Sequence, residues 1–229
     1  MSSSYLEKYR PRRLDEVVGN EQAKRRLTNW LIRMGVPRNV LFFGPTGSGK
    51  TTLARICAAA LSCDNRSPSS PDPCQRDTCP CALVLQADVA FGRGARARNG
   101  VDMSRADLDD DFAELAYVHE KPMIFIYDEI HRAPAHVRDS LLTRVESSTG
   151  LFHVFVVATD TTKLEPAFVT RFSRIETVVP TADQVVALLR RVSEAEDFGV
   201  SDEELSAIAW NDHLPRASLT SLWDLASTR

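Results

Sequence analysis

Residues 44–51 read Gly44-Pro45-Thr46-Gly47-Ser48-Gly49-Lys50-Thr51, which has the spacing G-x-x-x-x-G-K-S/T of a phosphate-binding loop. A short apolar run at 40–43 precedes the loop, and a run of small residues that predicts a helix over 50–61 follows it. Glycines let backbone N–H groups approach phosphate oxygens, and the helix N-terminus adds its positive dipole. The stretch therefore predicts a nucleotide-binding α/β fold with a P-loop between a buried strand and a helix.

The side chains at the end of this loop are the expected phosphate and metal contacts. Lys50 is expected to neutralise charge on the β- and γ-phosphates, and the Thr51 hydroxyl is expected to bind Mg²⁺. Thr52 completes the predicted nucleotide-binding stretch. These assignments predict ATP and Mg²⁺ as cofactors.

A second apolar run, from Met123 to Tyr127, ends in the acidic pair Asp128-Glu129. This is the Walker B arrangement, in which Asp128 is expected to hold Mg²⁺ and Glu129 to orient and polarise the attacking water. Taken alone, the pair is as readily an acidic turn after a core strand. Together with the P-loop it predicts hydrolysis of the nucleotide and not binding alone.

The remaining pattern predicts how the chain is organised. Apolar runs predict further strands at 83–85 and 151–158. Helical spacing predicts helices over 22–34, 108–116 and 134–146 and, beyond Pro180, over 185–192, 205–210 and 215–225. Strands that alternate with helices predict a parallel sheet flanked by helices over residues 1–179. The all-helical tail predicts a small second domain over residues 180–229.

The composition is ordinary for a soluble globular protein, because 28 Lys and Arg against 31 Asp and Glu give a net charge of −3 and 43% of residues are hydrophobic. The near-neutral charge excludes a histone-like basic binder, so any nucleic-acid contact must come from a local patch. No apolar run reaches the ~18 residues of a transmembrane helix, and Met1-Ser2-Ser3-Ser4-Tyr5 lacks the plan of a signal peptide. We therefore expect a cytoplasmic protein with no membrane partner.

One candidate patch is the expected loop over 92–104, which carries Arg93, Arg96 and Arg98 among glycines. These arginines either contact DNA phosphates or belong to a solvated loop, and the sequence leaves both readings open. Four aspartates that would oppose DNA follow closely, namely Asp107, Asp109, Asp110 and Asp111. The five histidines show no metal-ligand spacing and receive no role.

Four of the five cysteines crowd into residues 63–81, namely Cys63, Cys74, Cys79 and Cys81. This segment is rich in Pro, Ser and Asp and cannot build a hydrophobic core, so it predicts either a loop or a metal-stapled module. Clustered cysteines in an intracellular chain favour a metal over disulfides. Cys57 lies in an apolar helical run and is expected to be buried.

Four short motifs stand in a specific order along the chain. They are Tyr9-Arg10-Pro11, Glu16-Val17-Val18-Gly19-Asn20, Asp128-Glu129-Ile130-His131 and Val157-Ala158-Thr159-Asp160. This order resembles the AAA+ clamp-loader family, most closely the gamma/tau-type motor subunit of bacterial DNA polymerase III and next the small subunits of replication factor C. The resemblance covers residues 5 to about 226 and implies a P-loop AAA+ base with a helical lid.

The resemblance implies roles around the nucleotide. Tyr9-Arg10-Pro11 and Val17-Val18 would line the adenine pocket. Asp160 falls at the sensor 1 position near the γ-phosphate, where the family usually has Asn or Thr. Thr159 either shares or replaces this role, and the plain alternative is that Asp160 only opens a turn.

It also implies roles for two arginines. Val169-Thr170-Arg171-Phe172 stands where the family has Ser-Arg-Cys, so Arg171 would reach the γ-phosphate of a neighbouring subunit. Arg174 competes for this role, and a solvated surface arginine is the plain alternative. The helix that begins after Leu214 resembles the sensor 2 helix of the lid, from which Arg216 would reach over the nucleotide.

The four clustered cysteines match a further family feature. Gamma-type subunits carry a four-cysteine zinc module just after the P-loop helix, which implies structural Zn²⁺ at Cys63, Cys74, Cys79 and Cys81. The spacing here is C-x10-C-x4-C-x-C, whereas the family pairs its cysteines closer to C-x2-C. Free thiols on a loop therefore stay an alternative.

The function implied is that of an ATPase in an oligomer of AAA+ subunits, which grips a sliding clamp and primer–template DNA with ATP bound and releases them on hydrolysis. The alternative is a non-loader AAA+ regulator or adaptor in transposition, defence or plasmid maintenance. Clamp-loader subunits carry a third, collar domain, and this chain ends at Arg229 just after the predicted lid. We therefore expect either a fragment of a longer subunit or a different assembly.

Two other classes are disfavoured. Asp128-Glu129-Ile130-His131 is also a DExH helicase pattern, but the length leaves no room for a second helicase domain. A passive subunit that holds ATP without turnover is disfavoured because Lys50, Thr51 and both acidic residues are intact.

Overall fold

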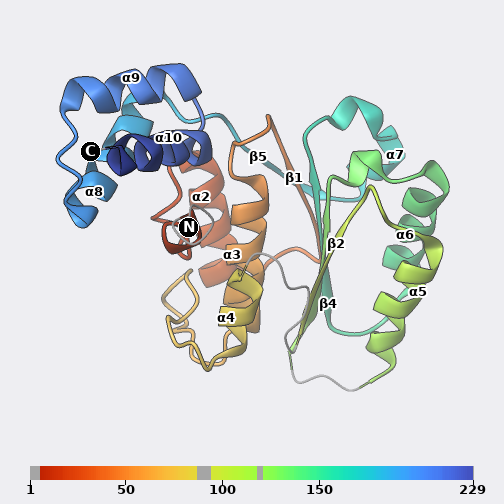
Figure 1. Ribbon diagram of the computed structural model, residues 1–229. Helices are drawn as coiled ribbons and strands as arrows, with labels where there is room; N and C mark the ends of the chain where they lie inside the picture. The colour runs from red at the N-terminus through yellow and green to blue at the C-terminus, as the bar shows by residue number, and fades with distance from the viewer. Residues whose placement is uncertain (1–5, 87–93, 118–120, 229) are drawn as a thin grey trace.

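A computed structural model of the protein describes residues 6–86, 94–117 and 121–228. Its centre is a five-stranded parallel sheet in the order β2-β3-β4-β1-β5. The strands are β1 (Asn39–Phe43), β2 (Ala95–Asn99), β3 (Met123–Asp128), β4 (Phe152–Ala158) and β5 (Ser173–Glu176). Parallel neighbours need crossover connections, and here these place helices on both faces of the sheet (Figure 1). The predicted α/β class is confirmed.

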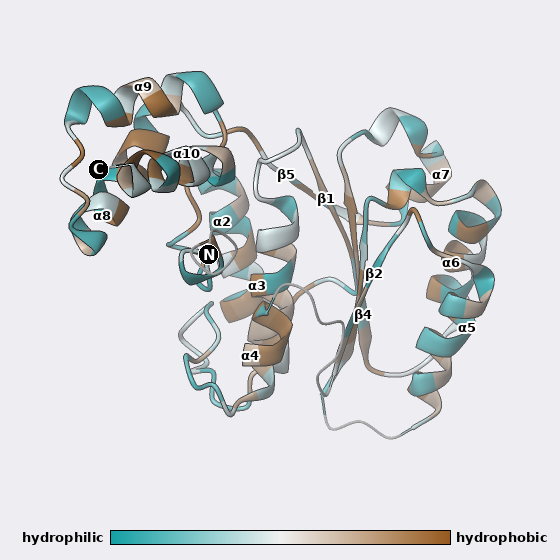
Figure 2. Ribbon diagram, in the orientation of Figure 1, coloured by the Kyte–Doolittle hydropathy of each residue, from teal (hydrophilic) through white to brown (hydrophobic). Residues whose placement is uncertain are grey.

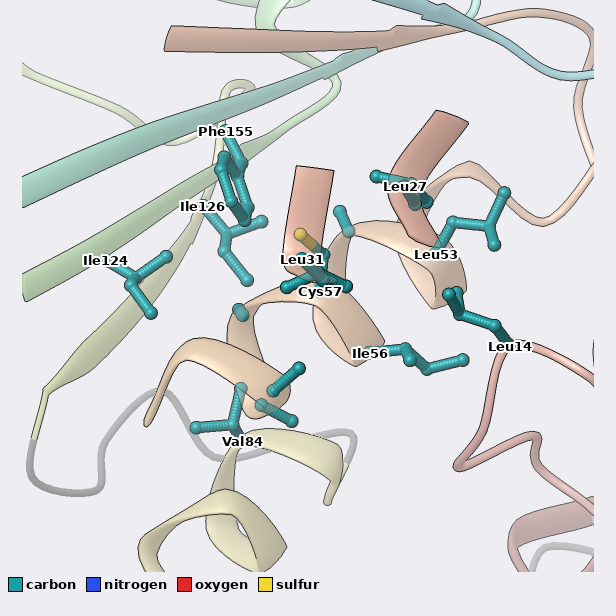
Figure 3. Close-up of a cluster of buried hydrophobic side chains, with 14 of the residues drawn as sticks. Leu14, Leu27, Leu31, Leu53, Ile56, Cys57, Val84, Ile124, Ile126 and Phe155 are labelled. Atoms are coloured by element: carbon teal, nitrogen blue, oxygen red, sulfur yellow. The ribbon is translucent and has the colours of Figure 1, made fainter. Parts of the chain in front are cut away.

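Three helices cover one face of the sheet, namely α2 (Glu21–Asn29), α3 (Lys50–Ser62) and α4 (Pro80–Leu85). A π-helical turn, η1 (Trp30–Met34), continues α2 without a break. Figure 3 shows Leu53 and Cys57 of α3 in one buried cluster with Leu27 of α2, Leu31 of η1 and Phe155 of β4. Cys57 is fully buried there, as predicted, and burial raises the pKa of its thiol to about 12.

The other face carries α5 (Arg105–Ala113) with its 3-10 extension η2 (Glu114–Ala116), α6 (Ala135–Ser147) and α7 (Pro166–Thr170). Aromatic side chains join these helices to the sheet. The Phe112 ring of α5 stacks on Phe125 of β3 at 5.2 Å and meets Phe152 of β4 edge-on at 5.7 Å. Two short 3-10 turns, η3 (Ile130–Arg132) and η4 (Thr161–Lys163), follow β3 and β4.

Beyond Pro180 the chain is helical, with α8 (Ala182–Glu196), α9 (Asp202–Asp212) and α10 (Pro215–Ser227). Capping boxes at Thr181 and Ser201 satisfy the first backbone N–H groups of α8 and α9. The three helices share their own core around Leu189, Leu205 and Leu222. Leu6 and Tyr9 of the N-terminal segment pack against this core, so the tail is joined to the start of the chain.

Apolar residues gather on the strands and on the inward faces of the helices, whereas the outer helix faces are polar (Figure 2). Of the helices in the described part of the chain, none has the length and apolar character needed to cross a membrane.

Two local predictions are wrong. Residues 83–85 were expected to form a strand but belong to α4, which packs on α3 through Val84. Pro80 at the first position favours a helix start, and a three-residue apolar run has no period that could separate the two structures.

The expected exposed loop at 92–104 contains β2, the edge strand of the sheet, over Ala95–Asn99. Arg98 donates two hydrogen bonds of 2.8 Å to the fully buried Asp111, and the Tyr127 hydroxyl donates to the same carboxylate at 3.1 Å. Arg96 also bonds Asp111, at 3.3 Å. These arginines hold α5 to the sheet edge, so they do not form a free basic patch, and Arg93 lies outside the described residues.

Candidate active site

A pocket of about 480 Å³ lies where the carboxyl ends of β1, β3 and β4 face the N-terminal segment and helices α8 and α10. Open α/β sheets bind ligands at this edge. Most of the residues predicted to hold nucleotide line it, namely Tyr9, Arg10, Pro11, Val17, Val18, Thr46, Gly47, Ser48, Gly49, Lys50, Thr51, Thr52 and Arg216. Gly44 and Pro45 belong to the same loop but are not among the lining residues.

The phosphate loop rests on Thr177, which follows β5. The Ser48 hydroxyl lies 2.6 Å from the Thr177 hydroxyl and donates to the Pro45 carbonyl at 2.7 Å. A Cβ at Gly44 would come within 2.2 Å of the Thr177 carbonyl oxygen, and the φ of Gly44 is 145°. The backbone approach at this position therefore requires glycine.

Lys50 opens helix α3 behind Gly49, whose φ of 90° is left-handed. Its Nζ donates to the Pro45 carbonyl at 2.7 Å, so the ammonium lies inside the curve of the loop. Burial lowers the pKa of Lys50, and the carboxylates of Glu129 and Asp128 act in the opposite direction. The ammonium is thus placed where it would meet a phosphate group.

Asn20 ties three segments together at the base of the pocket. It adopts the left-handed conformation with a φ of 59°, which Asn tolerates better than most residues. Its Nδ2 donates to the Ser48 carbonyl and its Oδ1 accepts from the Val178 N–H, both at 2.9 Å. The sequence shows Asn20 only as part of a motif, because both partners are remote along the chain.

Thr51 and Asp128 meet at the predicted magnesium position. The Thr51 hydroxyl donates to Asp128 Oδ2 at 2.9 Å, and the backbone N–H of Glu129 donates to Oδ1 at 2.9 Å. Burial raises the pKa of Asp128 against the effect of these two bonds. A hydroxyl beside a buried carboxylate offers the oxygen ligands that Mg²⁺ prefers. The positive charge of a bound Mg²⁺ would favour the ionised form of the carboxylate. These residues therefore fit the cation.

Glu129 lines the pocket in a strained backbone conformation. Its φ of 51° and ψ of 38° are left-handed, which is uncommon for a residue other than Gly or Asn and recurs at functional sites. Its carboxylate accepts a hydrogen bond of 3.2 Å from the Thr159 hydroxyl.

The structure separates the two candidates for the sensor 1 position. Thr159 lines the pocket, whereas Asp160 does not. Asp160 Oδ1 caps η4 by accepting the Thr162 hydroxyl at 2.6 Å and the Thr162 N–H at 2.9 Å, and these bonds lower the pKa of Asp160. The geometry differs from the expectation for Asp160 and favours Thr159.

His131, which received no role from the sequence, lies behind Glu129. Its Nε2 is 3.1 Å from the Thr159 hydroxyl and 3.4 Å from Glu129 Oε2, and its side chain is 5% exposed. No spacing could reveal this contact, because it depends on the parallel pairing that sets the end of β3 beside the end of β4.

The far end of the pocket is apolar. Leu188 of α8 and Leu219 of α10 line it together with Leu6, and the sequence analysis assigned none of these three to the site. The Tyr9 hydroxyl donates to the Glu196 carboxylate, which fastens the N-terminal segment to the end of α8. An apolar pocket opposite a phosphate loop suits the base of a nucleotide.

Arg216 lines the pocket from the first turn of α10. Just before it, Leu214 lies against the phosphate loop, since a Cβ at Gly47 would come within 2.7 Å of Leu214 Cδ2. The helical tail therefore contacts the loop directly.

Arg171 and Arg174 lie outside this pocket. Arg171 follows α7, is half-exposed, and donates from Nε to Glu146 at 2.5 Å. Arg174 is exposed on β5. Neither acts on the nucleotide site of its own chain in this geometry.

The four clustered cysteines converge. All four Sγ atoms lie within 4.8 Å of one another, with Cys63–Cys79 at 3.8 Å and Cys74–Cys81 at 3.7 Å. The cysteines are free thiols. The Cys63–Cys79 and Cys74–Cys81 separations match the edge of about 3.8 Å of a tetrahedron with Zn–S bonds of about 2.3 Å. Burial opposes ionisation of Cys79, but hydrogen bonds from the Cys81 and Asp64 backbone and the neighbouring thiols lower its pKa to about 6. The residues fit Zn²⁺ despite the irregular spacing.

A phosphate loop after β1 and an acidic pair at the end of β3, joined across one pocket, define a P-loop nucleotide-binding protein. Residues 40–180 match the family described as ATPase family associated with various cellular activities (AAA), and the chain belongs to this family. Its family and fold support binding of ATP with Mg²⁺ and ATP hydrolysis.

Individual relatives agree with this assignment. The DNA polymerase III subunit tau of Bacillus subtilis is 27% identical over 205 residues, which cover 88% of this chain and 35% of that protein. The replication factor C small subunit of Staphylothermus marinus is 25% identical over 205 residues, which cover 89% of this chain and 56% of that protein. The chain thus spans about a third to about half of these relatives. It is an AAA+ ATPase related to clamp-loader subunits, as the motif order predicted.

A solved structure shows the same fold. The Holliday junction branch migration motor RuvB of Thermotoga maritima superposes with a TM-score of 0.70 at 24% identity, over 97% of this chain and 66% of that one. At this identity the likeness concerns the fold alone.

Proposed function

We propose that the protein is a clamp-loader-type ATPase, which couples ATP binding and hydrolysis to the loading of a sliding clamp onto primer–template DNA within an oligomeric assembly. The observation that carries the proposal is that two replication proteins, the tau subunit and the replication factor C small subunit, each align with nearly nine-tenths of the chain.

The pocket supports a division of roles. Lys50 and Arg216 would hold the phosphates from opposite sides, and Thr51 with Asp128 would hold Mg²⁺, which neutralises phosphate charge when bound. Glu129 would orient the attacking water, and Thr159 would contact the γ-phosphate side. Residues 1–179 would act as the base and 180–229 as a lid whose angle follows the nucleotide through Arg216 and Leu214.

The test is the ATPase rate of the protein measured alone, with primed DNA, and with primed DNA plus the sliding clamp of the source cell. We expect clamp and primed DNA together to raise the rate by about tenfold, since they favour the assembled state. Unprimed duplex DNA of the same length is the control. An ATPase rate that neither DNA nor clamp changes would contradict clamp loading and leave an AAA ATPase that acts on another partner.

Arg171 supports the oligomeric part of the proposal, since it is exposed and remote from its own pocket. We expect Arg171→Ala to lower the ATPase rate at least about 100-fold, because an arginine supplied by a neighbour stabilises charge on the transferred phosphate. Mixing with Glu129→Gln subunits should restore activity, since these subunits supply an intact Arg171 to the neighbouring pocket of an Arg171→Ala subunit, whose Glu129 is intact. Arg174→Ala is the matched control, and a silent Arg171→Ala would show that the assignment is wrong.

A further inference from the structure

His131 touches both pocket-lining residues on which the proposed hydrolysis depends, yet it does not line the pocket itself. We propose that His131 is a positioning residue that joins Thr159 and Glu129 into one hydrogen-bonded unit. Thr159, on the γ-phosphate side, and the water-orienting carboxylate of Glu129 then change position together. This inference rests on the proposed role of Glu129 in ATP hydrolysis.

The hydrogens in this unit follow from the donor inventory. The Thr159 hydroxyl donates to Glu129 Oε2 at 3.2 Å, and a hydroxyl has one proton to give. The 3.1 Å contact between Thr159 Oγ1 and His131 Nε2 therefore needs the proton on Nε2. The same N–H faces Glu129 Oε2 at 3.4 Å. The chain of donors thus runs from His131 through Thr159 to Glu129.

The other ring nitrogen, Nδ1, does not explain why the His131 ring adopts this orientation. His131 Nδ1 is buried and has no hydrogen-bond partner among the described residues. A buried acceptor without a hydrogen bond raises the free energy of the folded state. We therefore attribute the orientation of the ring to the contacts of Nε2 with Thr159 and Glu129. Glu129 adds a second local cost through its left-handed backbone.

The arrangement provides a way to sense the phosphate. Thr159 and Glu129 follow different strands, and His131 lies on η3 between them. A phosphate oxygen that accepts the hydrogen bond of the Thr159 hydroxyl in place of Glu129 would free the Glu129 carboxylate for water. His131 would keep the oxygen of Thr159 in place during this exchange.

The experiment compares His131→Gln with His131→Asn, because the Gln amide reaches the position of Nε2, whereas the Asn amide reaches only the position of Nδ1. We expect His131→Asn to lower kcat about tenfold with an unchanged Kd for ATP, and His131→Gln to stay within about threefold of the wild type. In a Thr159→Val background, adding His131→Asn should lower kcat by less than about a further twofold. His136→Asn, on the exposed side of α6, is the control.

A wild-type kcat in His131→Asn would overturn the inference. Equal losses in His131→Gln and His131→Asn, with a lower Tm in both, would also overturn it and assign the ring to packing alone. Wild-type protein with no ATP turnover would remove the hydrolytic function and the inference with it. Turnover that clamp and DNA fail to stimulate would remove clamp loading only, and the variants would still decide the role of His131.

Discussion

Replacing Glu129 with glutamine is expected to lower kcat for ATP hydrolysis by at least about 100-fold while the affinity for ATP stays within about threefold. Glutamine keeps the shape of the side chain and still accepts the Thr159 hydroxyl through its carbonyl oxygen. It has no negative charge with which to polarise water. Steady-state phosphate release gives kcat, and equilibrium binding of a fluorescent ATP analogue gives the affinity.

The control is Glu203→Gln, which removes the same charge from the exposed first turn of α9. It should leave both quantities unchanged. Turnover near the wild-type value in Glu129→Gln would mean that another group orients the water. Loss of nucleotide affinity in that variant would instead give Glu129 a role in binding.

Cys81→Ser is expected to abolish zinc binding and to lower the melting temperature by about 5–10 °C, roughly 2–3 kcal/mol for a chain of this size. Cys81 lies in the first turn of α4 and is fully buried beside its three partner thiols. The module over residues 63–81 cannot build an apolar core, so the metal would supply much of its folding free energy. Metal analysis of wild-type protein should find about one zinc per chain.

Cys57→Ala is the matched control, because Cys57 is equally buried in α3 but lies outside the four-thiol cluster. The Cys57→Ala variant should keep its zinc and lose only the modest stability that creating a small cavity costs. Less than about half an equivalent of zinc in the wild-type protein would contradict a structural site.

Two short stretches of the chain were placed correctly from the sequence. The P-loop is one such case, since its glycines, Lys50 and Thr51 all stand within residues 44–51, and its position between β1 and α3 is as predicted. The strand that ends at Asp128 is another, because a continuous apolar run bounded by two carboxylates has few other structures. The convergence of four cysteines also agrees with the predicted metal module.

One prediction was wrong because the deciding partner comes from elsewhere in the chain. Arg96 and Arg98 looked like an exposed basic loop, because nothing nearby in sequence shows that Asp111 becomes fully buried against them. Asp160 is a different case, because its role was assigned from the family position, whereas two hydrogen bonds from the nearby Thr162 make it a cap of η4.

The sequence by itself determined the P-loop class and the chemical groups of the pocket, because these depend on short-range spacing and on the period of the apolar residues. Only the tertiary structure decided which groups meet across the sheet. Parallel pairing of β3 with β4 sets Glu129 and His131 beside Thr159. Packing of α8 and α10 brings Leu188 and Arg216 to the pocket and Leu214 against the phosphate loop. Such contacts join residues tens of positions apart, and no local pattern specifies them.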